Sequence, residues 1–253
     1  LFNGGWRNTT VTNNSLSFFG TIAYSLKDRY VLNANIRGDG SNRFGQDMRK
    51  RFDPTYSFGL SWRMAEEDFI KDNITWLDQL NLRATYGIQG YVVTSISPEL
   101  IAHQEGVIGG YNEYAVSISS IPNPFLKWER THTWNFGLDM QVFKGISMVF
   151  EYYGRRSNTF LSEDVAEEYG MSSLRLNGGR IYNEGLEFSL NMTPFKQKDF
   201  VWTIGLNASK NWNTSQNDDL TAKADRLTKG QFLSGSSQRP LKKGKPLSSF
   251  WSY

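Results

Sequence analysis

The stretch Trp134-Asn135-Phe136-Gly137-Leu138-Asp139-Met140-Gln141-Val142 decides how this chain folds. Every second residue in it is large and apolar, and every residue between is small or polar. Because a β-strand points successive side chains to opposite faces, this strand has one apolar face and one polar face. The same alternation recurs about eight times along the chain, which predicts an all-β protein built from antiparallel strands.

The apolar positions mark where the strands should lie. We expect strands at residues 16–26, 30–36, 56–64, 80–88, 134–142, 146–152, 186–192 and 202–208, and a ninth from residue 246. Short turns are expected at residues 27–29, 143–145 and 193–199, the last because Pro194 cannot donate to a strand ladder. A helical turn is expected within residues 66–71. The remaining connections are long, and the longest comprises residues 89–131. Short and long connections therefore alternate.

Three features favour lipid as the partner of the apolar face. Alternating runs of about 9–11 residues suit a tilted membrane crossing, whereas strands of soluble proteins average about 5–6 residues. Aromatic residues cluster at strand ends, and the apolar phase carries no charge before Lys210. Alternating connections fit periplasmic turns and extracellular loops. The sequence therefore predicts an antiparallel transmembrane β-barrel segment, with a soluble β-sandwich module as the alternative.

The polar phase indicates that the complete barrel is larger than this chain. An open sheet edge in lipid leaves backbone groups unpaired, so the complete barrel must close. Small residues on the polar phase, such as Gly59, Gly87 and Gly137, suit a wide interior that something else fills. We therefore expect about eight or nine strands that form one wall of a larger barrel with long extracellular loops.

Composition excludes several other classes. The chain has 39% hydrophobic residues and no apolar run of the roughly 18–20 residues that a spanning helix needs. A net charge of +3 without a basic run gives no reason to expect nucleic acid as a partner. The chain has no cysteine, so disulfides and thiolate chemistry are excluded.

Enzymatic and metal chemistry find little support. His103 and His132 lack metal-ligand spacing, and no Ser/His/Asp arrangement stands out, so we expect a non-enzyme without a cofactor. Two acidic clusters lack the alternating ligands and the glycine of a calcium loop. They are Glu163, Asp164, Glu167 and Glu168, and Asn217-Asp218-Asp219. Calcium bound by these loops stays an open alternative.

Several longer segments resemble a known family. Residues 34–45 read ANIRGDGSNRFG, and residues 52–63 read FDPTYSFGLSWR. Further segments of this kind are residues 66–69, 80–87, 121–130, 135–139, 183–188 and 244–250. Together, and in this order, they resemble the SusC/RagA family of TonB-linked (TonB-dependent) outer-membrane transporters.

The resemblance implies a barrel of about 22 strands, closed by a plug domain. Residues 1–253 would form a middle-to-late part of its β-barrel domain, with the plug domain and the TonB box outside this chain. The resemblance also implies active nutrient import across the outer membrane of a Gram-negative cell, through the TonB complex and with a SusD-like surface lipoprotein as partner. The implied cargo is an oligosaccharide or an oligopeptide. A passive porin-like barrel is the alternative mechanism.

Loop aromatics are the candidate contact residues for cargo or lid, because ring faces stack on sugars and pack at interfaces. They are Tyr111, Tyr114, Phe125 and Trp128. Packing within the loops is the alternative role of these side chains. No catalytic, metal-binding or cofactor-binding residue is expected.

Overall fold

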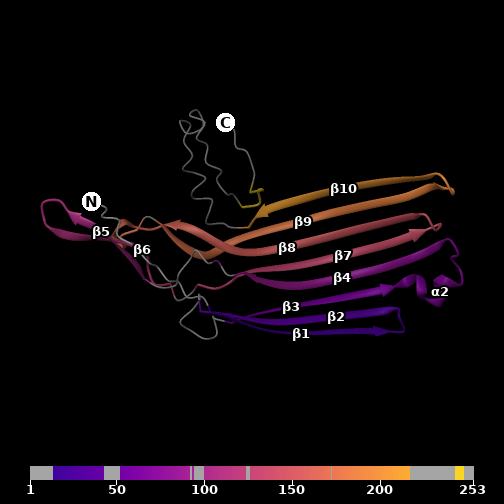
Figure 1. Ribbon diagram of the computed structural model, residues 1–253, viewed down its shortest axis with the longest axis horizontal. Helices are drawn as coiled ribbons and strands as arrows, with labels where there is room; N and C mark the ends of the chain where they lie inside the picture. Colours follow the sequence, from indigo (N-terminus) through magenta and orange to yellow (C-terminus); the bar gives the residue numbers. More distant parts are fainter. Residues whose placement is uncertain are drawn as a thin grey trace, which may run out of the picture.

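The computed structural model describes residues 14–42, 52–91, 93, 100–123, 126–171, 173–216 and 243–247. Its main feature is an antiparallel sheet of eight strands in the order β1-β2-β3-β4-β7-β8-β9-β10 (Figure 1). Successive strands of the chain are neighbours in this sheet, except that a long segment lies between β4 and β7. We call this segment, residues 92–128, the excursion. This up-and-down order is that of one wall of a barrel, and it confirms the predicted antiparallel fold.

The strands of the wall are longer than the sequence predicts. They are β1 Ser15–Leu26, β2 Tyr30–Ser41, β3 Phe52–Arg63, β4 Leu77–Tyr91, β7 Glu129–Val142, β8 Ile146–Asp164, β9 Ser173–Lys196 and β10 Val201–Ser215. The excursion contains a separate two-stranded sheet of β5 Ile101–Ile108 and β6 Glu113–Ser120. The helical elements are short: η1 Met64–Glu66, α2 Asp68–Lys71 and η2 Glu167–Tyr169. No helix among the described residues is both long and apolar enough to span a membrane.

The two ends of the wall differ in their connections. Residues 27–29, 143–145 and 197–200 make tight connections at one end, together with the segment that carries η1 and α2. We call this the short-turn end, and it confirms the expected helical turn within residues 66–71. The excursion with β5 and β6 lies at the opposite end, which we call the long-loop end (Figure 1). The tight connections at one end and the long excursion at the other follow the predicted alternation, and the connection between β8 and β9 does not.

Three predicted boundaries are wrong. The expected long loop before residue 182 is a strand hairpin, since β8 pairs with β9 as far as Asp164 and Ser173. The expected turn at residues 193–199 is shorter, because β9 continues through Pro194 to Lys196. A register shift between Trp202 and Ile204 of β10 accommodates the proline, which has no amide proton to donate. Of the expected ninth strand, residues 246 and 247 are described and are not strand, and the rest lies outside the described residues.

The strand register aligns the apolar positions into continuous rows across the wall. Leu82 of β4 lies opposite Leu138 of β7, which lies opposite Phe150 of β8, and that residue lies opposite Phe188 of β9. We call this side the apolar face and the other side the polar face. A one-residue slip of any strand would swap its two faces, so the shared rows fix the register of the wall.

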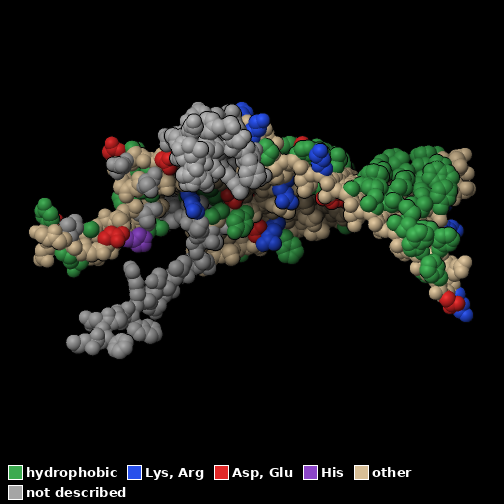
Figure 2. All heavy atoms as spheres, turned by 90° about the horizontal axis from the view of Figure 1, so that it is seen from above, with side chains coloured by type: hydrophobic (Ala, Val, Ile, Leu, Met, Phe, Trp, Pro, Cys, Tyr) green, Lys and Arg blue, Asp and Glu red, His purple; other side chains and the backbone are tan. Residues whose placement is uncertain are grey.

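The apolar face has no protein layer over it in the described part of the chain. Ile22, Leu60 and Phe136 expose 66%, 58% and 54% of their surface. Figure 2 shows hydrophobic side chains gathered at the short-turn end of the molecule. Among the described residues only Ile70, Ile88, Leu126 and Val142 are buried hydrophobics. A β-sandwich would bury this face as its core, so the structure argues against the sandwich alternative.

Beyond the aromatic residues, outside the predicted strand limits, the apolar phase becomes charged. Glu184 lies two residues from Leu186 on β9 and shares its face, and Arg156 lies four residues beyond Tyr152 on β8. Within the predicted strands the apolar phase is uncharged, and these charges lie where the strands extend further than the alternation of apolar residues shows. β9 has 24 residues. At about 3.4 Å per residue and a tilt of about 45° it spans roughly 58 Å, well over the ~25 Å apolar band of an outer-membrane barrel.

A cluster around Glu67 fixes the short-turn end. Tyr30 donates its hydroxyl to Glu67 Oε1 at 2.6 Å, and Trp62 donates its indole N–H to the same oxygen at 3.0 Å. Arg29 forms ion pairs with Glu67 at 2.9 Å and with Asp68 at 2.6 Å. The Tyr30 and Trp62 rings stack with their centroids 6.2 Å apart. Glu67 therefore links the connection between β3 and β4 to the strand ends beneath it.

The Glu67 cluster makes stability depend on pH. The hydrogen bond from Tyr30, followed by those from Trp62 and Arg29, holds the pKa of Glu67 below its usual value. The stabilisation is therefore complete above the usual glutamic acid pKa and is lost as the pH falls through the lowered folded-state pKa. Glu67→Gln should lower the thermal unfolding midpoint of the complete protein at pH 7, and the difference from wild type should shrink towards pH 3. A difference that grows on acidification would contradict this assignment.

Candidate functional site

The polar face holds a cavity of about 550 Å³ on β7, β8, β9 and β10, towards the long-loop end. Amide, hydroxyl and guanidinium side chains dominate its lining. They belong to Thr133, Asn135, Tyr153, Arg155, Asn183, Asn211 and Asn213. These seven are odd-numbered positions in the strands, opposite in phase to the apolar residues, so alternation places them together on the polar face. Glu184 and Trp212 also line the cavity and belong to the other phase.

Hydrogen bonds between the strands orient the side chains of this cavity. Tyr153 donates its hydroxyl to Asn211 Oδ1 at 2.6 Å, and Asn213 donates its amide nitrogen to Asn183 Oδ1. The backbone N–H of Leu247 donates to Asn213 Oδ1 at 2.9 Å. Asn135 and Arg155 also line the cavity, and no carboxylate among the described residues forms an ion pair with Arg155. The cavity thus offers both donors and acceptors in fixed positions.

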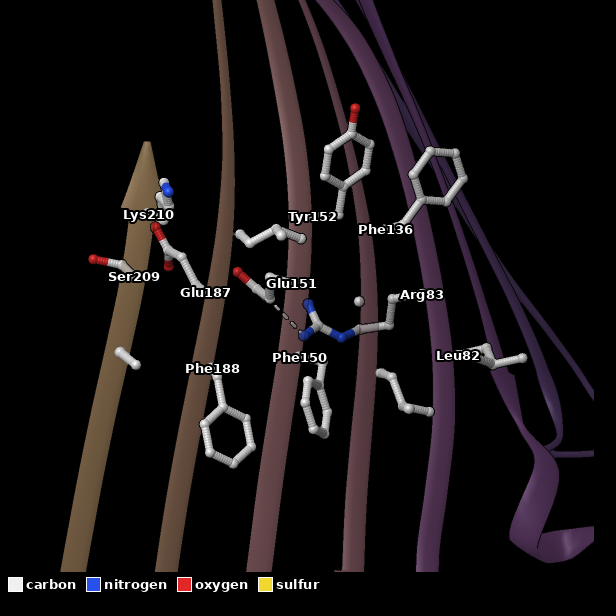
Figure 3. Close-up of a pocket in the computed structure, with 14 residues that line it drawn as sticks. Leu82, Arg83, Phe136, Phe150, Glu151, Tyr152, Glu187, Phe188, Ser209 and Lys210 are labelled. Carbon is white, nitrogen blue, oxygen red and sulfur yellow. Dashed lines mark hydrogen bonds and ion pairs between the residues drawn. The ribbon is translucent and has the colours of Figure 1, made fainter. Parts of the chain in front are cut away.

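An ion-pair cluster lies on the same face, nearer the middle of the wall. Arg83 of β4 binds Asp139 of β7 through two contacts of 2.8 Å and reaches Glu151 of β8 at 2.9 Å. Figure 3 shows the Arg83 side chain reaching from β4 across β7 towards Glu151. Glu151 lies directly opposite Glu187, and Arg83 offsets the repulsion between these two carboxylates.

Glycine makes room for this crossing. A Cβ atom at Gly137 would lie 2.9 Å from the guanidinium of Arg83. At Gly154 a Cβ would overlap the ring of Trp134, and at Gly185 it would overlap Tyr153. Several glycines of the wall are therefore positions over which a long side chain lies, besides being small residues that widen the interior.

A second depression, of about 560 Å³, lies among aromatic and aliphatic side chains and carries no binding assignment. Its lining includes Phe136, Phe150, Tyr152, Leu186 and Phe188, which belong to the apolar face (Figure 3). Such a surface suits lipid chains, which have no polar groups to recognise. On the polar face, by contrast, amides, a phenol and a guanidinium offer hydrogen-bond donors and acceptors.

The structure does not bring the candidate loop aromatics together. Tyr111 lies in the turn between β5 and β6, and Tyr114 lies in β6; they expose 78% and 65% of their surface. Trp128 lies just before β7 and packs on the buried Leu126 beside Val93 and Phe160. Phe125 lies outside the described residues. Tyr111 and Tyr114 stay candidates for contact with a lid or cargo, and Trp128 also has the packing role that was the alternative.

Sequence reasoning missed the cavity residues of β8, β9 and β10. Asn183, Asn211 and Asn213 lie beyond the expected ends of their strands, so they were not assigned to a face. The signal was the phase itself, since Asn135, Asn191 and Asn207 already lie on the polar side. In the part of the chain that the structure describes, no group of three or more His, Asp or Glu side chains is arranged to hold a metal ion.

The known proteins that this chain is similar to are TonB-dependent receptors. The chain is 32% identical over 248 residues to TonB-dependent receptor P3 of Formosa agariphila, covering 94% of this chain and 24% of the relative. It is 33% identical over 223 residues to TonB-dependent receptor SusC of Bacteroides thetaiotaomicron, covering 84% of this chain and 22% of that protein. The chain therefore spans about a quarter of the length of these relatives.

A solved structure shows the same fold. The wall superposes on a structure of the RagAB peptide transporter with a TM-score of 0.69 and 26% sequence identity, covering 81% of this chain and 22% of that one. The family model described as "TonB dependent receptor-like, beta-barrel" matches residues 1–250. This chain belongs to the TonB-dependent receptor β-barrel family, whose members are outer-membrane receptors and transporters of Gram-negative bacteria.

Proposed function

We propose that the complete protein is an active importer in the outer membrane, and that this segment forms part of its barrel wall. The observation that carries the proposal is the two-sided chemistry of the same strands. β7 to β10 present an exposed apolar face on one side and a hydrogen-bonding cavity on the other. In a closed barrel the apolar face meets lipid and the polar face lines the passage.

The proposed orientation follows from the connections. Outer-membrane barrels have short periplasmic turns and longer extracellular loops. The short-turn end would therefore face the periplasm, and the long-loop end, with the excursion and the cavity, would face outside. A plug domain would fill the passage, the TonB complex would drive its opening, and a SusD-like lipoprotein would cover the extracellular mouth.

The proposed cargo is an oligosaccharide or an oligopeptide. Both carry many hydroxyl, amide or carbonyl groups, which the asparagine side chains of the cavity can pair as donors and acceptors. The structurally similar RagAB is a peptide transporter, which supports the peptide class. The SusC/RagA resemblance supports both classes.

Replacing two cavity asparagines should weaken uptake without harming assembly. In the complete protein, Asn135→Leu with Asn183→Leu removes two oriented amides, at about 1 kcal/mol for each hydrogen bond to cargo. The apparent affinity for cargo should fall roughly tenfold or more. Uptake of labelled oligosaccharide and oligopeptide pools by cells that express either form measures the effect and identifies the cargo class. Asn33→Leu, on the polar face of β2, is the matched control.

The same uptake assay distinguishes active import from passive diffusion. Collapse of the proton-motive force should stop uptake by an importer that depends on TonB. Uptake that continues unchanged after collapse would instead support the passive porin-like alternative.

A further inference from the structure

One row of polar side chains crosses four strands of the wall on the polar face, towards the long-loop end. Thr133 of β7 lies opposite Arg155 of β8. Arg155 lies opposite Asn183 of β9, which in turn lies opposite Asn213 of β10. All four side chains line the polar cavity of about 550 Å³. Directly opposite residues have Cβ atoms about 4.5–5.5 Å apart, so neighbouring side chains of this row can contact one small group together.

Arg155 has no counter-charge, unlike two other arginines of the polar face. Arg37 contacts Asp39 at 2.7 Å, and Arg83 contacts Asp139 at 2.8 Å. Within the described ranges of the chain, no ion pair joins Arg155 to a carboxylate. Arg155 is an exposed residue, so its positive charge is available to a molecule that enters the cavity.

The asparagine oxygens on the β9 and β10 side of the cavity are already engaged. Asn183 Oδ1 accepts from the side-chain amide of Asn213, and Asn213 Oδ1 accepts from the backbone N–H of Leu247 at 2.9 Å. Asn211 Oδ1 accepts from the hydroxyl of Tyr153 at 2.6 Å. An amide that accepts through its oxygen still has its N–H groups to donate. Next to the guanidinium, the cavity therefore presents mainly hydrogen-bond donors.

Two further groups in the cavity lining bear on the charge of its ligand. Glu184 belongs to the other phase, and its carboxylate accepts from the hydroxyls of Tyr152, at 3.2 Å, and Tyr182. The Thr133 hydroxyl oxygen is shielded from solvent and has no hydrogen-bond partner in the part of the chain that the structure describes. A shielded hydroxyl without a partner is unfavourable, and an oxygen atom of a bound ligand would supply one.

The row lies at the outer end of the membrane-spanning part of the wall. Thr133 is nine residues before Val142, which lies beside a tight turn of the short-turn end. At about 3.4 Å per residue and a tilt of about 40°, this is roughly 23 Å along the membrane normal, close to the full apolar band of about 25 Å. In the proposed orientation the row therefore lies at the extracellular entrance, where cargo arrives.

We propose that Arg155 and the amides beside it bind a carboxylate group of the cargo, so that the importer selects acidic compounds over neutral ones. A guanidinium binds a carboxylate through two parallel N–H···O bonds, and the amide N–H groups of Asn183 add further donors. A carboxylate has only acceptor oxygens, which matches the donors that the cavity presents. The inference rests on the proposed import function and adds to it the charge of the cargo.

The test uses pairs of compounds that differ only in their carboxylates. The purified complete protein in detergent is dialysed to equilibrium against a pool of oligogalacturonates and a pool of tryptic peptides, and against both pools after methyl esterification. Mass spectrometry quantifies each compound that the protein retains. We expect the wild type to bind carboxylates about tenfold more tightly than their esters, and Arg155→Gln to lower the affinity for carboxylates about tenfold. The pool that supplies the retained compounds identifies the cargo as sugar or peptide.

Two further variants serve as controls. Arg156→Gln removes the same charge one residue away, on the opposite face of β8, and it should bind the carboxylates like wild type. Arg155→Lys keeps the charge and loses the planar fork of the guanidinium, so the affinity for carboxylates should fall only about threefold.

Several outcomes would overturn the proposal. They are equal retention of carboxylates and esters, retention of no carboxylate, and equal loss in Arg155→Gln and Arg156→Gln. A lower thermal unfolding midpoint of Arg155→Gln with unchanged carboxylate binding would also overturn it, since Arg155 would then pair with an acidic residue elsewhere in the complete protein. Retention of esters alone would leave the importer assignment in place. Uptake that survives collapse of the proton-motive force would remove that assignment and leave the carboxylate site.

Discussion

Phe188→Arg should prevent assembly of the complete barrel or destabilise it by about 2–4 kcal/mol, the cost of an arginine at the middle of the bilayer. Phe188 lies on the apolar face of β9, with its ring 4.6 Å from that of Phe150. Four residues separate it from Met192, which pairs with Ile146 beside the tight turn, so it lies roughly 10 Å into the membrane. Heat-modifiable migration on gels reports assembly, and urea unfolding in lipid vesicles reports stability.

Ser189→Arg is the matched control for Phe188→Arg. Ser189 is the next residue of β9 and lies opposite Val149 and Asn207 on the polar face. A charge on that side meets water, so we expect a cost below about 1 kcal/mol. If both variants lost the same stability, the two faces of the wall would be wrongly assigned, because a one-residue step along a strand exchanges its environments.

Arg130→Met should destabilise the long-loop end by about 2–4 kcal/mol, because it leaves a buried carboxylate without its counter-charge. Asp53 has a side chain that is 3% exposed, and it accepts from Arg130 Nε at 2.8 Å and from Nη2. Arg130 is itself 43% exposed, which places the cost below that of a fully buried pair. Hydrogen exchange of β3 and β7 in the complete protein measures the local loss.

A double variant distinguishes the interaction between Arg130 and Asp53 from the separate contributions of the two residues. Arg130→Met combined with Asp53→Asn removes the unpaired charge, so it should cost less than Arg130→Met alone. Arg37→Met is a control on an exposed pair, since Arg37 is 57% exposed where it contacts Asp39, and it should cost under about 1 kcal/mol. Costs that simply add in the double variant would mean that Asp53 and Arg130 stabilise the wall independently.

The parts of the fold that could be predicted from the sequence are those that lipid constrains. Leu138, Phe150, Phe188 and Leu206 show alternation because only one side of each strand meets hydrocarbon, and all four lie on the expected face. Beyond the bilayer both faces of a strand meet water, and the alternation disappears. The ends of β8 and β9, around Asn158 and Asn177, could not be recognised for this reason.

The loss of alternation outside the bilayer also explains why the residues of the candidate site were not predicted. Asn183, Asn211 and Asn213 lie where polar residues occupy both faces, so only the phase carried over from Asn191 and Asn207 assigns them to the polar face. The Asp53–Arg130 pair joins residues 77 positions apart across β4, at a point where Gly90 has no side chain in the way. Its detection requires the pairing of β3, β4 and β7, which the sequence does not contain. The loop aromatics were proposed from their chemistry alone, and the three that the structure describes lie in the hairpin of β5 and β6 and just before β7.

The place where the excursion leaves the wall has a consequence for how such barrels diversify. Tyr91 and Glu129 lie opposite each other in the ladder of β4 and β7, so strand pairing holds the two ends of the intervening segment close together. The hairpin of β5 and β6 forms a sheet of its own. Doubling the length of such a segment costs only about 0.6 kcal/mol in closure entropy. The length of this segment can therefore change at little cost and create new surface specificities without a change in the pairing of β4 and β7.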